Sequence, residues 1–83
     1  MIRILLVEDH SLVRAGIRAL LAGLDDMTVV AEASDAEGAI RQVAQQNPDM
    51  VLMDIALPGV NGLELTAHFR RTHPQLQVII LSM

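Results

Sequence analysis

Four polar side chains lie at the ends of three apolar runs of the kind that forms a buried strand: Glu8, Asp9, Asp54 and Ser82. The carboxyl ends of strands in an open α/β sheet gather at one edge, so we expect these side chains to meet there. Carboxylates crowded into a partly dehydrated site repel one another unless a cation enters or a proton is retained. Magnesium accepts a few carboxylates together with waters and phosphate oxygens. The pattern therefore predicts a Mg2+ site that includes Glu8, Asp9 and Asp54.

Asp54 is also a candidate nucleophile. It stands between the apolar residues 50–53 and a turn-rich run at 58–62, which is typical of a strand that delivers one carboxylate to a loop. With a metal screening the negative charges, a free oxygen of Asp54 could attack phosphorus in line and form an acyl phosphate. Ser82, one strand away, could donate its hydroxyl to the new phosphoryl oxygens and so link phosphorylation to a surface rearrangement.

The elements that must position these groups follow from the hydrophobic pattern. Residues 2–7, 27–33, 50–54 and 77–82 are predicted to be strands, and residues 11–24, 34–46 and 63–72 repeat apolar side chains at helical spacing. Ser34 and Glu37 have the spacing of a capping box at the start of the second helix. The apolar residues that we expect this helix to turn inward are Ala36, Ala39, Ile40, Val43 and Ala44. Strands joined by helices favour right-handed crossovers, so the sequence predicts an α/β doubly wound domain with a parallel sheet in the order 2-1-3-4.

Composition excludes several classes of protein. A chain of 83 residues that is 52% hydrophobic, with Phe69 as its single aromatic residue, can form one domain with an aliphatic core. No apolar run reaches the roughly 18–20 residues of a membrane span and no signal peptide is evident, so we expect a cytoplasmic protein without a membrane partner. The absence of cysteine leaves oxygen and imidazole as metal ligands. A net charge of −4 gives no basic surface, so we expect no direct binding to nucleic acid.

Three segments at matched spacing resemble the receiver domain of two-component response regulators: Leu5–His10, Asp54–Gly62 and Val78–Ser82. The run from His10 to Gly16 is similar to the NarL/FixJ subfamily in particular. The resemblance implies a flavodoxin-like (CheY-like) fold and a phosphoacceptor signalling domain that is not an enzyme. It also implies a sensor histidine kinase as partner and, in the full-length relative, a transcriptional output domain. The residue roles that it implies are Glu8 and Asp9 as the acidic pair for Mg2+, Asp54 as the phosphorylated aspartate, Ala56 as donor of a backbone carbonyl to the metal, and Ser82 as the switch hydroxyl.

The sequence departs from the family pattern at one point. Family receivers carry a lysine after a fifth strand, whereas all six basic residues of this chain are arginines. We therefore expect residues 1–83 to form a partial receiver, a (βα)3β unit without the last helix, strand and helix. The output DNA-binding domain is expected to be absent from these residues.

Two further functions are compatible with parts of the pattern. The fourth strand would present a free edge and apolar faces, so the chain could act only as a self-associating interaction module, as a homodimer or higher oligomer, without competent phosphorylation. A magnesium-dependent phosphohydrolase would also use a strand-end aspartate, but it usually places a second acid two residues later, where this chain has Ala56. His10 could ligate a metal, but a residue in this flanking loop is expected to be exposed to solvent, and the resemblance assigns it no chemistry.

Overall fold

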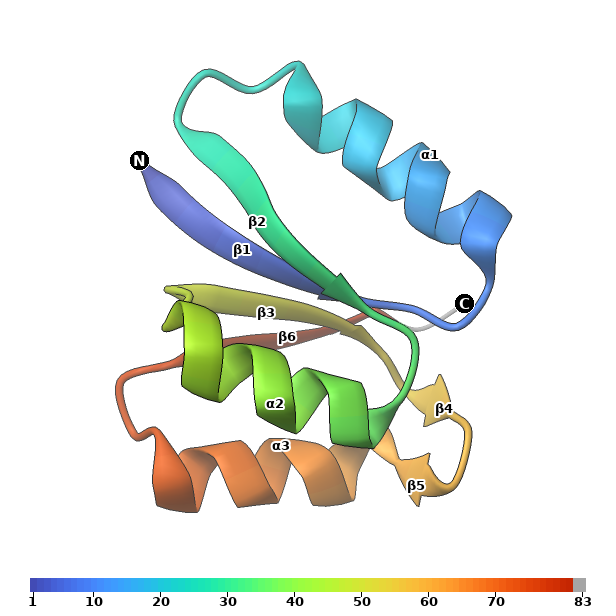
Figure 1. Ribbon diagram of the computed structural model, residues 1–83, viewed down its shortest axis with the longest axis vertical. Helices are drawn as coiled ribbons and strands as arrows, with labels where there is room; N and C mark the ends of the chain where they lie inside the picture. Colours follow the sequence, from blue (N-terminus) through green and yellow to red (C-terminus); the bar gives the residue numbers. More distant parts are fainter. Residues whose placement is uncertain (82–83) are drawn as a thin grey trace.

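A four-stranded parallel sheet forms the centre of the computed structural model, which describes residues 1–81 (Figure 1). Its strands lie in the order β2-β1-β3-β6, which confirms the predicted order 2-1-3-4 with β6 as the fourth strand. The strands are β1 (Ile2–Val7), β2 (Met27–Ala33), β3 (Met50–Asp54) and β6 (Gln77–Leu81). The helices that connect them are α1 (Ser11–Ala22), α2 (Ala36–Gln46) and α3 (Gly62–Thr72).

The main core lies between the sheet and the two helices α2 and α3. Figure 1 shows these helices on one side of the sheet and α1 on the other. In the two central strands, β1 and β3, every second side chain points toward α2 and α3, as strand geometry requires. The fully or nearly fully buried residues of this layer are Leu5, Val7, Val51, Met53, Ala39, Val43, Leu65 and Phe69. The continuous apolar sequence of β1 is explained by burial on both faces, since Ile4 and Leu6 are also 0% exposed.

The helix α1 is packed less deeply than its apolar stripe predicts. None of its residues is buried, and Leu12 and Leu20 are 85% and 77% exposed. The helix also ends at Ala22 rather than at Leu24, because Gly23 caps it with its backbone N–H. Within residues 1–81, α1 is the single helix on its side of the sheet, so much of its apolar stripe has no neighbouring helix to contact.

The start of α2 differs from the prediction by one residue. The capping box of Ser34 and Glu37 is wrong: Asp35 is the N-cap, and its side chain accepts a hydrogen bond of 2.7 Å from the Gly38 amide. A carboxylate at this position accepts from the helix backbone and is favoured by the helix dipole, so it replaces the serine as the cap. The inward face is also narrower than predicted, since Ile40 and Ala44 are exposed while Ala39 and Val43 are buried.

A small hairpin occupies the turn-rich segment after β3. The strands β4 (Ala56–Leu57) and β5 (Val60–Asn61) pair antiparallel around Gly59, whose φ of 81° is readily adopted by glycine. Asn61 then caps α3 by accepting from the Leu63 amide at 2.7 Å. Across the described part of the chain, no helix is long and apolar enough to cross a membrane.

Candidate functional site

The register of β1 on β3 brings the acidic residues to one edge of the sheet. The two strands are parallel, with Val7 beside Met53, so Glu8 and Asp54 are the next residues along each strand. Asp54 is in turn paired with Leu81 of β6. The backbone amide of Glu8 extends the pairing with β2 by donating to the Ala33 carbonyl at 3.0 Å. The carboxyl ends of the strands therefore meet as the sequence predicted.

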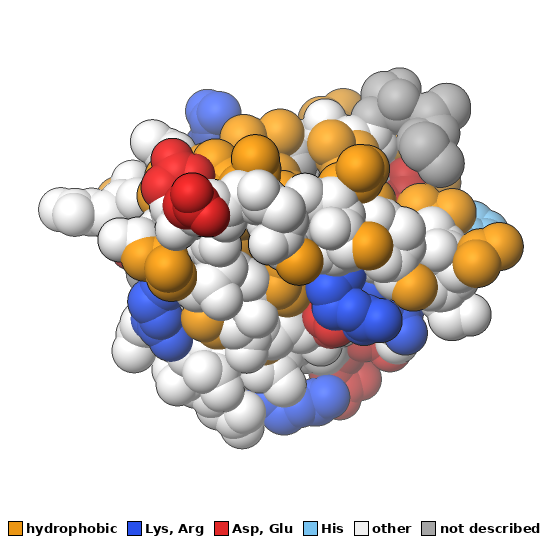
Figure 2. All heavy atoms as spheres, turned by 90° about the horizontal axis from the view of Figure 1, so that it is seen from above, with side chains coloured by type: hydrophobic (Ala, Val, Ile, Leu, Met, Phe, Trp, Pro, Cys, Tyr) orange, Lys and Arg blue, Asp and Glu red, His pale blue; other side chains and the backbone are white. Residues whose placement is uncertain are grey.

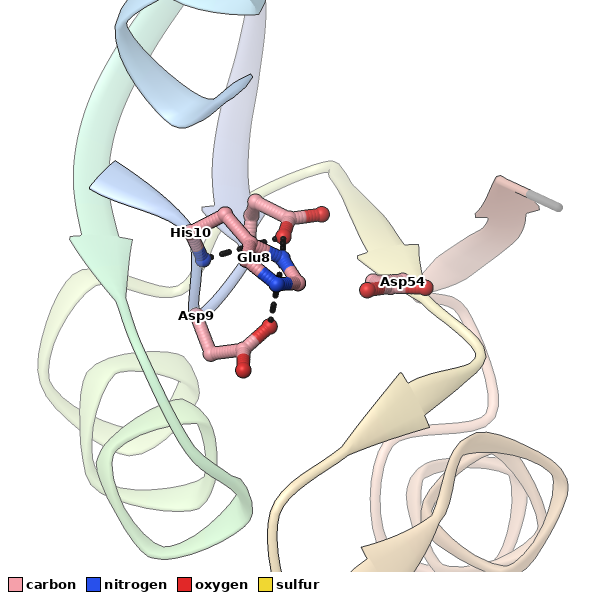
Figure 3. A group of neighbouring side chains, drawn as sticks. All are labelled: Glu8, Asp9, His10 and Asp54. Atoms are coloured by element: carbon pink, nitrogen blue, oxygen red, sulfur yellow. Dashed lines mark hydrogen bonds and ion pairs between the residues drawn. The ribbon is translucent and has the colours of Figure 1, made fainter. Parts of the chain in front are cut away.

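Four side chains form a cluster at this edge: Glu8, Asp9, His10 and Asp54 (Figure 3). Each offers one possible ligand atom, and these atoms lie within 4.8 Å of one another. Glu8 and Asp54 are buried, with 3% and 9% of their surface exposed, whereas Asp9 is half-buried. The geometry thus brings together the three carboxylates predicted for the Mg2+ site.

Glu8 is fixed by bonds to both its backbone and its side chain. Its carbonyl accepts a hydrogen bond of 2.7 Å from the Arg14 guanidinium, and its Oε1 accepts from the His10 amide at 3.0 Å. Arg14 and Arg18 also reach Glu32 of β2, at 3.1 Å and 2.8 Å, which ties α1 to the sheet beside the site. These contacts hold the end of β1 and the start of α1 in one arrangement.

Asp54 is oriented by the hairpin that follows it. Its Oδ1 accepts a hydrogen bond of 3.1 Å from the backbone amide of Ala56, the first residue of β4. The predicted role of Ala56 was to offer its carbonyl to the metal, and that role stays a prediction. What the structure places beside the Asp54 carboxylate is the Ala56 amide, which restrains the rotation of the side chain.

His10 is a member of the cluster that the sequence reasoning left without a role. Its side chain is 68% exposed, as expected, yet its Nδ1 lies 2.8 Å from Glu8 Oε1 and 3.2 Å from Asp9 Oδ1. The hydrogen bond to Glu8, followed by the charge of Asp9, raises the pKa of His10 above its ordinary value of 6.5. Its position two residues after Glu8 was the available signal, because a side chain at that spacing can fold back on a strand-end acid.

One oxygen of Asp9 indicates that a cation fits the cluster. Asp9 Oδ1 is shielded from solvent and has no hydrogen-bond partner within the described residues. The nearby His10 ring gives it an electrostatic contact, but the ring nitrogen lies closer to Glu8. A shielded carboxylate oxygen without a donor is costly, and a hard cation supplies the missing interaction. Glu8, Asp9 and Asp54 are thus a suitable oxygen donor set for Mg2+.

Two residues that sequence reasoning did not assign to the site are His10 and Arg14. Arg14 lies one turn into α1, off its apolar stripe. The signal in the sequence was a positively charged side chain so close to an acidic strand end. Ser82, the predicted switch hydroxyl, lies outside the described residues.

The fold and the site together define a class: a doubly wound α/β domain with a carboxylate cluster at the carboxyl end of its sheet. Within that class, residues 4–83 match the family model of the response regulator receiver domain. The chain belongs to this family and is a receiver domain, a signalling domain of two-component response regulators.

Similar proteins of known sequence agree with this assignment. The chain is 42% identical to the response regulator GacA of Pseudomonas viridiflava and 43% identical to the response regulator UvrY of Escherichia coli K12, over 83 residues in both cases. The matches cover 100% of this chain but 39% and 38% of those relatives. The chain thus spans about two fifths of the length of the curated relatives that it matches.

Solved structures share the fold over nearly the whole chain. A LuxR-family two-component response regulator from Aurantimonas sp. SI85-9A1 has a TM-score of 0.95 at 42% identity, covering 100% of this chain and 59% of that one. The receiver domain of NarL from Mycobacterium tuberculosis has a TM-score of 0.91 at 30% identity, covering 98% of this chain and 65% of that one. The predicted likeness to the NarL/FixJ subfamily is consistent with these neighbours.

Proposed function

We propose that this receiver accepts a phosphoryl group on Asp54 from a sensor histidine kinase, in a reaction that depends on Mg2+. The observation that carries the proposal is the convergence of Glu8, Asp9 and Asp54 within 4.8 Å, with an oxygen of Asp9 shielded and without a donor. Family membership supports the same reaction, because the matched family is the receiver domain of response regulators.

Each residue of the proposed site has a chemical task. Glu8 and Asp9 would hold the cation, and the Ala56 carbonyl is proposed as a further ligand. Bound Mg2+ would supply neutralisation of the carboxylate and phosphoryl oxygens. The Ala56 amide orients Asp54 through its bond of 3.1 Å to Oδ1. An Asp54 oxygen then attacks phosphorus, the new O–P bond forms as the N–P bond to the kinase histidine breaks, and that histidine leaves with the electron pair. The Ser82 hydroxyl is proposed to donate to the transferred group.

The partners follow from this reaction and from the longer relatives. We propose that residues 1–83 form part of a receiver that acts in the cytoplasm, and that a separate output domain in the full-length protein binds DNA. RcsB of Salmonella enterica, whose chain is 27% identical to this one, has a solved structure bound to a promoter. The acidic balance of this chain, a net charge of −4, supports a division in which these residues themselves do not contact DNA.

The test is phosphorylation or its mimicry at Asp54. Incubation with acetyl phosphate and Mg2+ is expected to label the chain on Asp54, as located by mass spectrometry, and beryllofluoride is expected to shift the NMR signals of residues 8–10 and 54–56. Both effects should disappear in Asp54→Asn and in the presence of EDTA. Labelling that survives Asp54→Asn, or that needs no divalent ion, would overturn the proposal.

A second proposed activity, self-association, is favoured by apolar surface on one side of the sheet. Leu12 and Leu20 of α1 are 85% and 77% exposed, and Ile79 of β6 is 43% exposed. Among the described strands, β6 is paired only with β3, so its other edge is open. Figure 2 views the molecule from the side on which α1 lies, where hydrophobic side chains reach the surface in several places. Open strand edges and exposed apolar side chains both favour contact with a second copy.

Sedimentation velocity over a range of concentrations tests this activity. We expect a concentration-dependent dimer or larger species, and Ile79→Lys should shift it toward the monomer. Leu63→Lys is the matched control, because Leu63 is 57% exposed but lies on α3, on the opposite side of the sheet. A monomer at all concentrations would refute self-association and leave the phosphoacceptor proposal intact.

A further inference from the structure

The imidazole of His10 contacts two carboxylates of the acidic cluster, and the phosphoacceptor function does not require these contacts. His10 comes from the loop between β1 and α1, and its ring lies over the carboxylates of Glu8 and Asp9 (Figure 3). We propose that His10 is a ligand in this site, so that the site binds nitrogen-preferring divalent ions such as Co2+ and Zn2+ more tightly than its carboxylates alone would. The proposal rests on the acidic site of the proposed function, but not on phosphoryl transfer.

Two distances within the cluster are compatible with atoms that share one ion. Zinc binds imidazole nitrogen and carboxylate oxygen at about 2.0–2.2 Å, so two ligands at angles between 90° and tetrahedral lie about 2.9–3.4 Å apart. His10 Nδ1 is 2.8 Å from Glu8 Oε1 and 3.2 Å from Asp9 Oδ1. Both distances from the ring nitrogen therefore fall close to the range expected for two ligands of one metal. The fourth group, Asp54, offers a carboxylate oxygen within 4.8 Å of the other possible ligand atoms.

The surroundings of the ring allow it to act as a ligand without disturbing the core. The His10 side chain is 68% exposed, so its reorientation displaces no buried group. When Nδ1 binds a metal it gives up its hydrogen bond to Glu8 Oε1, but that oxygen keeps the bond of 3.0 Å from the His10 amide. The Asp9 oxygen that has no donor gains the interaction that it lacks. Every polar atom of the cluster that changes partner thus finds a new one.

The chemical type of the ligands determines which ions the site binds more tightly. Carboxylates and waters suit magnesium, calcium and manganese, whereas an imidazole adds affinity for zinc, copper, nickel and similar ions. Loss of His10 should therefore weaken the binding of Co2+ and leave the binding of Mg2+ nearly unchanged. That difference separates a ligand from a residue that only supports the local fold.

The experiment compares the wild-type chain with His10→Gln and with His73→Gln, without any phosphoryl donor. His73 is the matched control, because it follows the last turn of α3 and contacts Thr72 rather than the carboxylates. Co2+ binding is followed by visible absorption, and Mg2+ binding by NMR chemical shifts. We expect His10→Gln to weaken Co2+ binding by about tenfold or more and Mg2+ binding by less than about threefold, with no change in His73→Gln. In the wild-type chain, the ring signals of His10 should be the first histidine signals broadened by substoichiometric Co2+.

Four results would overturn the proposal. The first is wild-type Co2+ affinity in His10→Gln, and the second is no Co2+ binding by the wild-type chain. The third is an equal loss of Co2+ and Mg2+ binding in His10→Gln, and the fourth is broadening that begins at another histidine. Failure of Asp54 to accept a phosphoryl group would not produce any of them, so the two proposals fail separately. Circular dichroism of each variant verifies that the fold is retained.

Discussion

Replacement of Gly62 by alanine is expected to disturb the acidic site through the backbone. A Cβ at Gly62 would lie 2.9 Å from the Cα of Ile55, 3.0 Å from the Ile55 carbonyl oxygen and 3.2 Å from the Asp54 carbonyl oxygen. All three contacts are with backbone atoms, which cannot rotate away as a side chain could. Ordinary contact begins near 3.4 Å, so the start of α3 must move away from the end of β3 by about 0.5 Å.

The size of the effect follows from two opposing contributions. Overpacking of this kind costs about 1–3 kcal/mol, and the better helix propensity of alanine offsets up to about 1 kcal/mol of that cost. The net loss is therefore about 0–3 kcal/mol, and each kcal/mol lowers Tm by about 4–8 °C in a domain of this size. The movement also displaces Asp54, so Mg2+ affinity should fall together with Tm.

Gly16 provides a matched control in α1. A Cβ there would meet no atom within 4 Å, so Gly16→Ala should raise the free energy of unfolding by about 0.5–1 kcal/mol through helix propensity alone. Thermal unfolding followed by circular dichroism, at one protein concentration for all variants, measures both changes, and isothermal titration measures Mg2+ affinity. A Gly62→Ala variant that is as stable as the wild type and binds Mg2+ equally well would refute this close packing of α3 against the end of β3. Equal destabilisation by the two substitutions would also contradict it.

Three further predictions concern the core, a helix cap and the histidine of the site. Phe69, which is 1% exposed, fills the core below α3, so Phe69→Ala should lower the free energy of unfolding in urea by about 3–5 kcal/mol; a change below about 1 kcal/mol would contradict this packing. Asp35→Ala should lower the free energy of unfolding by about 0.5–2 kcal/mol, whereas Ser34→Ala should change it by about a few tenths of a kcal/mol. A larger effect of Ser34→Ala would instead support Ser34 as the N-cap. The hydrogen bond to Glu8 raises the pKa of His10 above 6.5, so its stabilising contribution is present below about pH 6.5 and is lost as pH rises through the folded-state pKa. NMR titration should show this raised pKa returning toward its ordinary value in Glu8→Gln, and a value at or below 6.5 in the wild type would refute the pairing.

The parts of the fold that follow from the periodic spacing of hydrophobic residues were predictable from the sequence. The strand β1 has an unbroken apolar run because both of its faces are covered, and this burial identifies it as a central strand. The meeting of Glu8 and Asp54 follows from that central place, since parallel strands end at the same edge. These features depend on many residues at once, so a change in the hydrogen bond of one side chain would not alter them.

The features that sequence reasoning missed depend on single contacts. Whether Ser34 or Asp35 caps α2 is decided by which side chain reaches the Gly38 amide, and both have suitable chemistry. How deeply the residues of α1 are buried depends on what else packs on that side of the sheet. The apolar stripe of the helix alone does not contain this information. The contact of His10 with Glu8 does not follow from its expected exposure, because the ring folds back on Glu8 while most of its surface stays in solvent.

The pairing of β1 with β3 makes the acidic site sensitive to the number of residues in the chain, and not only to their type. Side chains alternate along a strand, so deletion of one residue from β1 would turn Glu8 to the opposite face of the sheet even though every carboxylate is still present. Deletion of two residues would restore the face but withdraw the acid by about 6.6 Å. An added residue in the turn between α1 and β2 leaves the alignment of β1 with β3 unchanged. Insertions and deletions should therefore preserve the acidic site when they lie after α1 and disrupt it when they lie before Glu8. A library of single-residue insertions and deletions would reveal this difference.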